Sequence, residues 1–217
     1  MTIYNVQIIL ITHTNWSVFL EVVTIKASYD LKQTILDTAI NILHEKSYHK
    51  TSVDEIVKEA GTTKGGFYYY FQNKEDLLYQ IHEKFMENEL NYAMEVYHKK
   101  ELSTETKLRM IISDLIKSIN DHRSYVVIFF RERHNLTSDH LEKIVKKRDH
   151  YFNIVKDLIG QGIKEGRFRK DLDSAVIALG LFGMCDWTYQ WYREDGKYST
   201  DDVAKMFTEI FFNGILK

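Results

Sequence analysis

Apolar residues recur every three or four positions along most of the chain, which is the spacing of amphipathic α-helices. Two stretches show it most clearly: Ile35, Ala39, Ile42 and Leu43 in the first, and Leu77, Leu78, Ile81 and Phe85 in the second. The 217 residues include no proline, although average usage would place about eleven in a chain of this length. We therefore expect an all-α fold of about nine helices, near residues 30–47, 53–60, 64–71, 74–98, 104–122, 124–135, 139–165, 173–193 and 200–215.

Start and stop signals divide this pattern into a small head and a larger bundle. Polar caps with a carboxylate three residues later predict helix starts, and glycines predict stops; they are Ser52, Asn73, Ser199, Gly61 and Gly166. The first three helices are short and the rest long, so we place a head at residues 27–73 and a bundle at residues 74–217. Residues 1–26 are rich in β-branched residues, unlike the helical pattern that follows, so we expect them to form an appendage of unknown role. Polar residues interrupt its apolar run too often for it to span a membrane.

The segment from Thr51 to Lys74 carries the most specific signal. It reads TSVDEIVKEAGTTKGGFYYYFQNK, a capped short helix, a glycine turn and a second short helix, which is the helix-turn-helix plan. Gly65 and Gly66 each cost about 1 kcal/mol relative to alanine inside a helix, and the helical period places them opposite Phe67 and Phe71. Such a bare, tyrosine-rimmed face predicts a helix that enters the DNA major groove.

Charge limits how strongly one head can bind DNA. The whole chain carries a net charge of -2, so the protein as a whole has no general attraction to nucleic acid. Between residues 60 and 74, however, there are two lysines and no acidic residue. We therefore expect one head to bind weakly and two heads of a homodimer to bind one palindromic site together.

These residues resemble the DNA-binding head of the tetracycline-repressor (TetR) family. The shared pattern is carried by Thr51, Val53, Ile56, Ala60, Gly61, Thr63, Lys64, Gly65, Tyr68, Tyr70, Phe71, Asn73, Lys74 and Leu77. Thr62 departs from it, since an apolar residue is usual there, and the N-terminal arm is apolar where the family often has a basic one. From the residues and the resemblance together, the candidate DNA contacts are Thr51, Thr63, Lys64, Gly65, Gly66, Tyr68, Tyr69, Tyr70 and Lys74.

The resemblance also implies that the last two long helices form a four-helix dimer interface. Small and apolar residues on these helices suit close packing across a two-fold axis. The candidate interface residues are Ala178, Gly183, Val203, Phe207, Ile210 and Phe211. The alternative is that the same faces close the core of a monomer.

A ligand pocket is expected inside the aromatic-rich bundle. The stretch from Leu181 to Tyr198 is similar to the C-terminal domain of family members that regulate fatty-acid or steroid degradation and sense acyl-CoA thioesters. That likeness implies an apolar slot for the acyl part and arginines for the anionic part. The candidate ligand residues are Phe129, Phe130, Arg131, Arg133, Tyr151, Trp187, Trp191 and Arg193; for the arginines, ordinary surface ion pairs are the alternative.

The sequence argues against enzymatic and metal chemistry. It has no nucleophile elbow and no glycine-rich phosphate loop, and its nine histidines match no metal-ligand spacing. A single cysteine, Cys185, excludes an internal disulfide and suits a reducing compartment, so we expect a cytoplasmic protein without a cofactor.

The sequence thus predicts a transcriptional repressor that a small apolar ligand, with acyl-CoA as the candidate, releases from a palindromic operator. Two alternatives stay open. One is a regulator whose ligand tightens DNA binding, as a co-repressor or in activation. The other is a helical lipid carrier that has kept the helix-turn-helix shape.

Overall fold

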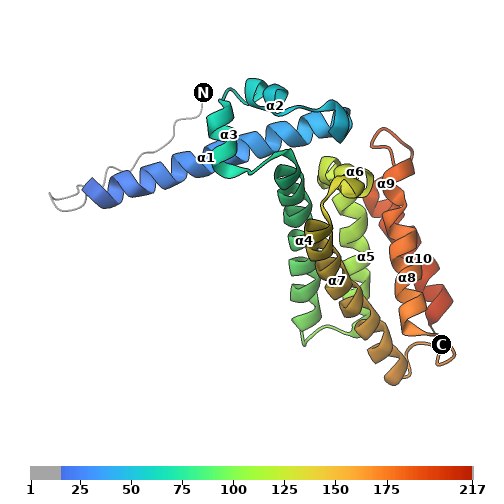
Figure 1. Cartoon of the computed structure of the whole chain (residues 1–217). Coiled ribbons are helices and arrows are strands. Elements are labelled where there is room, and N and C mark those ends of the chain that lie inside the picture. Colours follow the sequence, from blue (N-terminus) through green and yellow to red (C-terminus); the bar gives the residue numbers. More distant parts are fainter. Residues whose placement is uncertain (1–15, 217) are drawn as a thin grey trace, which may run out of the picture.

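The computed structural model describes residues 16–216 and is built from α-helices (Figure 1). Within these residues the helices are α1 (Trp16–Glu45), α2 (Val53–Glu59), α3 (Lys64–Tyr70), α4 (Lys74–His98), α5 (Thr104–Asp121), α6 (Arg123–Glu132), α7 (Ser138–Lys164), α8 (Ser174–Asp186), α9 (Thr188–Trp191) and α10 (Thr200–Ile215). Two 3₁₀ turns, η1 (Tyr48–Lys50) and η2 (Arg133–Asn135), complete the described part. The predicted all-α class is confirmed.

The polar caps begin the helices where the sequence predicts. The Ser52 hydroxyl accepts from the backbone N–H of Glu55, and the Asn73 side chain accepts from the N–H of Asp76. Ser199 and Asp202 form a full, reciprocal capping box at the start of α10. Both predicted glycine stops take the left-handed backbone that favours glycine, with φ of +65° at Gly61 and +72° at Gly166.

Two helices differ from the expected boundaries. Helix α1 begins at Trp16 rather than near residue 30, because neither glycine nor proline interrupts the residues between. The expected helix at 173–193 is divided at Trp187 into α8 and α9. Just after the break, the Thr188 hydroxyl donates to the Met184 carbonyl, four residues earlier. Of the expected appendage, residues 1–15 lie outside the described residues.

The head consists of α1, α2 and α3 and lies across one end of the body (Figure 1). Its centre is apolar: Leu43, Ile56, Phe67 and Phe71 are almost completely buried. The junction of α3 and α4, at Asn73, is also where the chain passes from the head into the body.

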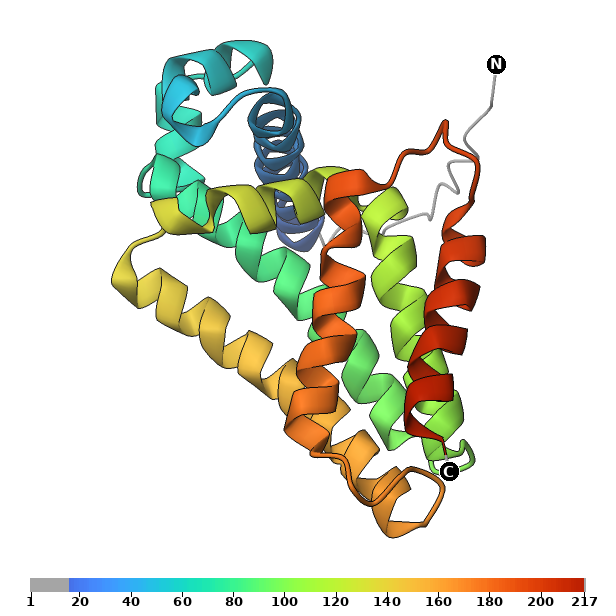
Figure 2. The ribbon, with the colours of Figure 1, turned by 90° about the vertical axis from the view of Figure 1, so that its right-hand side faces the viewer.

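In the body, α4, α5, α7, α8 and α10 run along a common direction, and α6 crosses them beside the head (Figures 1 and 2). Figure 2 shows α7 and α8 close together at the end far from the head and diverging toward it, so that α6, α7 and α8 outline a triangle. In the described part of the chain, no helix is both long and apolar enough to cross a membrane.

Candidate DNA-binding helix and ligand cavity

Helix α3 is held on one side and open on the other. Thr63 caps its N-terminus by accepting from the N–H of Gly66 at 3.1 Å, and Phe67 anchors it in the head core. On the opposite side, Tyr68 and Tyr69 keep 54% and 77% of their surface exposed. This face, with its exposed phenols, is therefore open to a large partner.

The two glycines of α3 have different structural roles. A Cβ added at Gly65 would meet only the Thr63 hydroxyl, at an ordinary 3.6 Å, and the residue is exposed. A Cβ added at Gly66 would lie 2.6 Å from the Thr62 hydroxyl oxygen. Close packing against Thr62 therefore accounts for Gly66, whereas Gly65 leaves the backbone open, so only one of the two glycines follows the expected outward-facing pattern.

Lys64 is the exposed cation of this helix. Its ammonium lies 2.7 Å from Asp54 on α2, and this hydrogen bond raises the pKa of Lys64. Both side chains are more than half exposed, and such surface pairs contribute little to stability. A phosphate can therefore compete for Lys64 at low cost.

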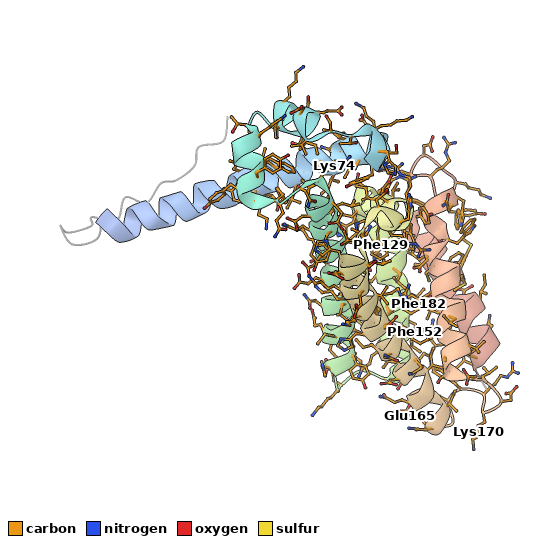
Figure 3. All side chains as sticks on the ribbon, viewed as in Figure 1. Lys74, Phe129, Phe152, Glu165, Lys170 and Phe182 are labelled. Atoms are coloured by element: carbon orange, nitrogen blue, oxygen red, sulfur yellow. The ribbon has the colours of Figure 1, made fainter. Side chains whose placement is uncertain are left out.

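Two other candidate DNA residues have internal partners. The Thr51 side chain is buried and donates to the Ser47 carbonyl at 3.2 Å. The Lys74 ammonium donates to the carbonyls of Tyr48 and Thr51 at 2.8 and 2.6 Å and lies 4.0 Å from the centre of the Tyr48 ring. Burial lowers the pKa of Lys74. Since an ammonium has three donors, Lys74 fixes η1 to α4 and retains one N–H; Figure 3 shows it where the head meets the body.

The structure places Arg131 at the junction between head and body, whereas the sequence suggested a ligand contact. The guanidinium donates to the carbonyls of Leu43, His44 and Lys46, at and just beyond the C-terminus of α1. Glu132, which is buried, holds the guanidinium from the other side at 2.8 Å. Cations stabilise the negative end of a helix dipole, so α6 is tied directly to α1.

A second link joins the start of α4 to the start of α7. The Glu75 carboxylate accepts from the backbone N–H of Thr137 at 2.8 Å and contacts His140 Nδ1 at 2.9 Å. Burial by itself would raise the pKa of Glu75, but these hydrogen bonds together outweigh it and lower the pKa. Both links connect segments more than 60 residues apart, and the sequence pattern did not reveal them.

A cavity of about 490 Å³ lies inside the body, between the head-proximal parts of α4, α5, α6, α7 and α8. Its apolar lining includes Phe85, Phe129, Phe130 and Phe182, and Figure 3 shows Phe129 next to the head and Phe182 further down the body. This size and composition suit a small-molecule site.

Half of the expected ligand residues line the cavity. Phe129, Phe130, Arg133 and Tyr151 line it; Arg131, Trp187, Trp191 and Arg193 do not. Trp187 and Trp191 are exposed on the outside of the body, and Arg193 pairs with Asp195 in the loop before α10.

Polar residues missed by the sequence reasoning also line the cavity: Glu89, Ser118, His134, Arg148 and Asp186. Burial raises the pKa of Glu89 and that of Asp186 to about 7 each. Burial also raises the pKa of Tyr151, whose hydroxyl has no hydrogen-bond partner among the described residues. One signal was available for Glu89, because it interrupts the apolar face of α4 between Phe85 and Ala93.

An apolar face on α8 and α10 is uncovered in the isolated chain. Val176, Leu179, Trp187 and Ile210 each expose more than 60% of their surface, and Gly183 is exposed between them. Of the other expected interface residues, Phe207 is partly buried, and three are buried inside the subunit: Ala178, Val203 and Phe211. The uncovered face therefore includes residues that the sequence did not single out and omits three that it did.

Comparisons with known proteins agree with this architecture. A model described as "Bacterial regulatory proteins, tetR family" matches residues 35–81, and a model of a tetracyclin repressor-like C-terminal domain matches residues 101–215. The fatty acid metabolism regulator protein of Bacillus subtilis (strain 168) is 28% identical over 182 residues, covering 83% of this chain and 93% of that protein. The HTH-type transcriptional repressor KstR2 of Rhodococcus jostii (strain RHA1) is 24% identical over 182 residues, covering 83% and 89%.

Solved structures share the fold. FadR from Bacillus subtilis in complex with stearoyl-CoA superposes with a TM-score of 0.72 at 26% identity, over 85% of this chain and 99% of that one. AibR in complex with isovaleryl coenzyme A and operator DNA gives a TM-score of 0.76 at 24% identity, over 84% and 98%. The family models together cover most of the sequence, and the chain belongs to the tetR family of bacterial regulatory proteins, as a DNA-binding transcriptional regulator and not an enzyme.

Proposed function

We propose that this protein is a transcriptional repressor whose homodimer leaves its operator when each subunit binds an acyl-CoA. The observation that carries the proposal is the combination, in one subunit, of an exposed α3 and an apolar cavity with arginines at its lining. The fatty acid regulator and the stearoyl-CoA complex among the relatives support the same ligand class.

Helix α3 supplies the DNA contacts. Gly65 lets the backbone approach the major groove, Tyr68 and Tyr69 donate to phosphate oxygens, and Lys64 pairs with a phosphate after leaving Asp54. Thr51 and Lys74 contribute by fixing the position of α3 through η1. The protein acts where bacterial DNA is, in the cytoplasm.

The uncovered face of α8 and α10 forms the dimer interface. Large exposed apolar patches mark interaction surfaces, and a two-fold axis brings the same patch of both subunits together. Pairing there covers Trp187 and Ile210 and presents two α3 helices to one palindromic site, about 34 to 36 Å apart.

The acyl part of the ligand occupies the cavity, and its anionic part lies against Arg133 and Arg148. Both guanidinium groups line the cavity and belong to exposed side chains, so they can bind phosphates without the cost of burying a charge. His134, also exposed, adds a further donor at the same end.

Helix α6 transmits the signal. Phe129, Phe130 and Arg133 face the cavity from α6 and η2, while Arg131, between them, holds the C-terminus of α1. A ligand that displaces α6 therefore moves the head. To change operator occupancy from 99:1 to 1:99, the ligand must favour the released state by about 5.5 kcal/mol.

A mobility-shift experiment tests the proposal. The full-length protein is titrated onto the DNA that flanks its own gene, without ligand, with oleoyl-CoA and with free CoA. We expect a retarded complex that oleoyl-CoA releases and free CoA does not. Failure to bind any palindrome at low salt would refute the proposal that the protein binds an operator. Tighter DNA binding in the presence of oleoyl-CoA would indicate that the ligand is a co-repressor instead.

A further inference from the structure

The cavity wall formed by α4, α5 and α7 carries a polar cluster in an otherwise apolar surface. It consists of Glu89 from α4, Ser118 from α5 and Tyr151 from α7, all of which line the cavity. Glu89 is 6% exposed, Ser118 is equally buried and Tyr151 is 4% exposed. Neither the DNA contacts nor the binding of a phosphate needs these groups.

The hydrogen bonds inside this cluster are incomplete. The Ser118 hydroxyl donates to Glu89 Oε1 at 2.8 Å, and no other hydrogen bond of the Glu89 side-chain oxygens is found within residues 31–216, whose side chains the structure describes. The Tyr151 hydroxyl is buried without a protein partner in the same part of the chain. A buried hydroxyl without a partner is destabilising unless water or a ligand supplies one.

The lining also restricts what that partner can be. Burial raises the pKa of Glu89 to about 7, so near neutral pH its carboxyl is protonated in much of the population and can donate as well as accept. Tyr151, whose pKa burial raises, stays a neutral donor. Arg133 and Arg148 along the same cavity disfavour a cationic group, and the carboxyls of Glu89 and Asp186, where they are ionised, disfavour an anionic group beside the cluster. A neutral hydroxyl oxygen fits these groups best.

We propose that the cavity is selective for acyl-CoA ligands whose acyl part carries a hydroxyl group, which bonds to Tyr151 and Glu89, over unsubstituted alkyl chains. The inference rests on the proposed function, because it assumes that the acyl part occupies this cavity. An alkyl chain would expel water from the cluster and leave the Tyr151 hydroxyl without a partner. Sites built to bond a hydroxyl discriminate strongly against analogues that lack it.

Isothermal titration calorimetry on the full-length protein tests the proposal. The probes are dodecanoyl-CoA and four derivatives with one hydroxyl, at carbon 3, 6, 9 or 12 of the chain. We expect at least one derivative to bind about tenfold more tightly than dodecanoyl-CoA, the ratio that a single well-placed hydrogen bond provides. Equal or weaker binding of all four derivatives would overturn the inference.

Two variants assign the preference to the cluster. Tyr151→Phe should lower the affinity for the preferred derivative about tenfold, and it should leave the affinity for dodecanoyl-CoA unchanged or increase it, because no buried hydroxyl then loses its water. Glu89→Met replaces the carboxyl by an apolar group of similar shape. It should also reduce the ratio of the affinity for the preferred derivative to that for dodecanoyl-CoA, and it tests the proposal if Tyr151→Phe does not fold. Tyr125→Phe is the matched control, since that phenol does not line the cavity. An unchanged ratio in both cluster variants would assign the preference elsewhere and refute the proposal.

The outcomes separate the inference from the proposed function. If all five thioesters bind alike and release the operator, the acyl-CoA repressor stands and the polar selectivity is wrong. If none of them binds, the acyl-CoA ligand itself is refuted, and the selectivity falls with it.

Discussion

Replacing Glu89 by glutamine should change how the stability of the protein depends on pH. The carboxyl is buried against Ser118, and burial raises its pKa from 4.5 to about 7. Glutamine keeps an oxygen that accepts from Ser118 but cannot ionise. The substitution therefore removes the titration and preserves the hydrogen bond.

The sign follows from proton binding. Between pH 4.5 and 7 the folded state retains a proton that the unfolded state releases, so this carboxyl makes the free energy of unfolding fall as pH rises. Relative to the unfolded state, ionising Glu89 in the folded state costs about 3.4 kcal/mol, because its pKa rises from 4.5 to about 7 and each tenfold change in acidity corresponds to about 1.36 kcal/mol. Between pH 5 and pH 8 the wild type should lose about 2.5 kcal/mol that the variant keeps.

Urea denaturation at pH 5 and pH 8, followed by circular dichroism, measures the difference. The pKa of Asp114 and that of Asp186 are also raised by burial, to about 6 and about 7, so both proteins should lose stability with pH and only the gap between them is diagnostic. Glu87→Gln, at an exposed position on the same helix, should follow the wild type. Parallel profiles for Glu89→Gln and the wild type would show that Glu89 is not desolvated and refute the reasoning.

Five further substitutions test the head, its link to the body and the proposed dimer interface. Lys64→Ala should weaken operator binding and lower the slope of log affinity against log salt by about 2 per dimer, one phosphate per subunit; fluorescence anisotropy at several salt concentrations measures it, and an unchanged slope excludes the phosphate contact. Gly65→Ala should keep or raise the melting temperature and weaken operator binding, whereas Gly66→Ala should lower the melting temperature, because its Cβ would lie 2.6 Å from a neighbouring hydroxyl oxygen; the opposite ranking in a thermal melt would contradict the assigned roles. Arg131→Ala should leave acyl-CoA affinity within about twofold but reduce ligand-induced release of DNA, so full release would show that this contact does not transmit the signal. Ile210→Asp should give a monomer in analytical ultracentrifugation and lower operator affinity at least about 100-fold, the range that bivalency provides; a stable dimer would place the interface elsewhere.

The sequence predicted the elements well because the signals for helices are local. Spacing of apolar residues, caps such as Ser52 and Asn73, and the glycine stops at Gly61 and Gly166 all act within one or two turns. The start of α1 was missed because nothing in the sequence marks it. The break at Trp187 was missed because neither glycine nor proline stands there to mark it.

The candidate sites differ in the same way: one could be derived from local sequence and the other could not. The exposed face of α3 could be derived from residues 63–71 alone, since burial of Phe67 and Phe71 fixes which way the helix faces. The uncovered face of α8 and α10 could not, because the helical period identifies an apolar face but not which part of it the subunit's own core covers. Ala178 is buried by that core, and Val176 two residues earlier is exposed.

The sequence by itself therefore determined the helical class, the helix-turn-helix and the kind of regulator, because each depends on residues that are close together in the sequence. Only the tertiary structure decided which glycine of α3 is exposed, that Arg131 holds the C-terminus of α1, and that Glu89, Ser118 and Tyr151 line one cavity. The physical reason is distance along the chain: Ser118 and Glu89 are 29 residues apart, and Arg131 and Leu43 are 88 apart. Contacts of that length depend on how whole helices pack, and no local pattern specifies them.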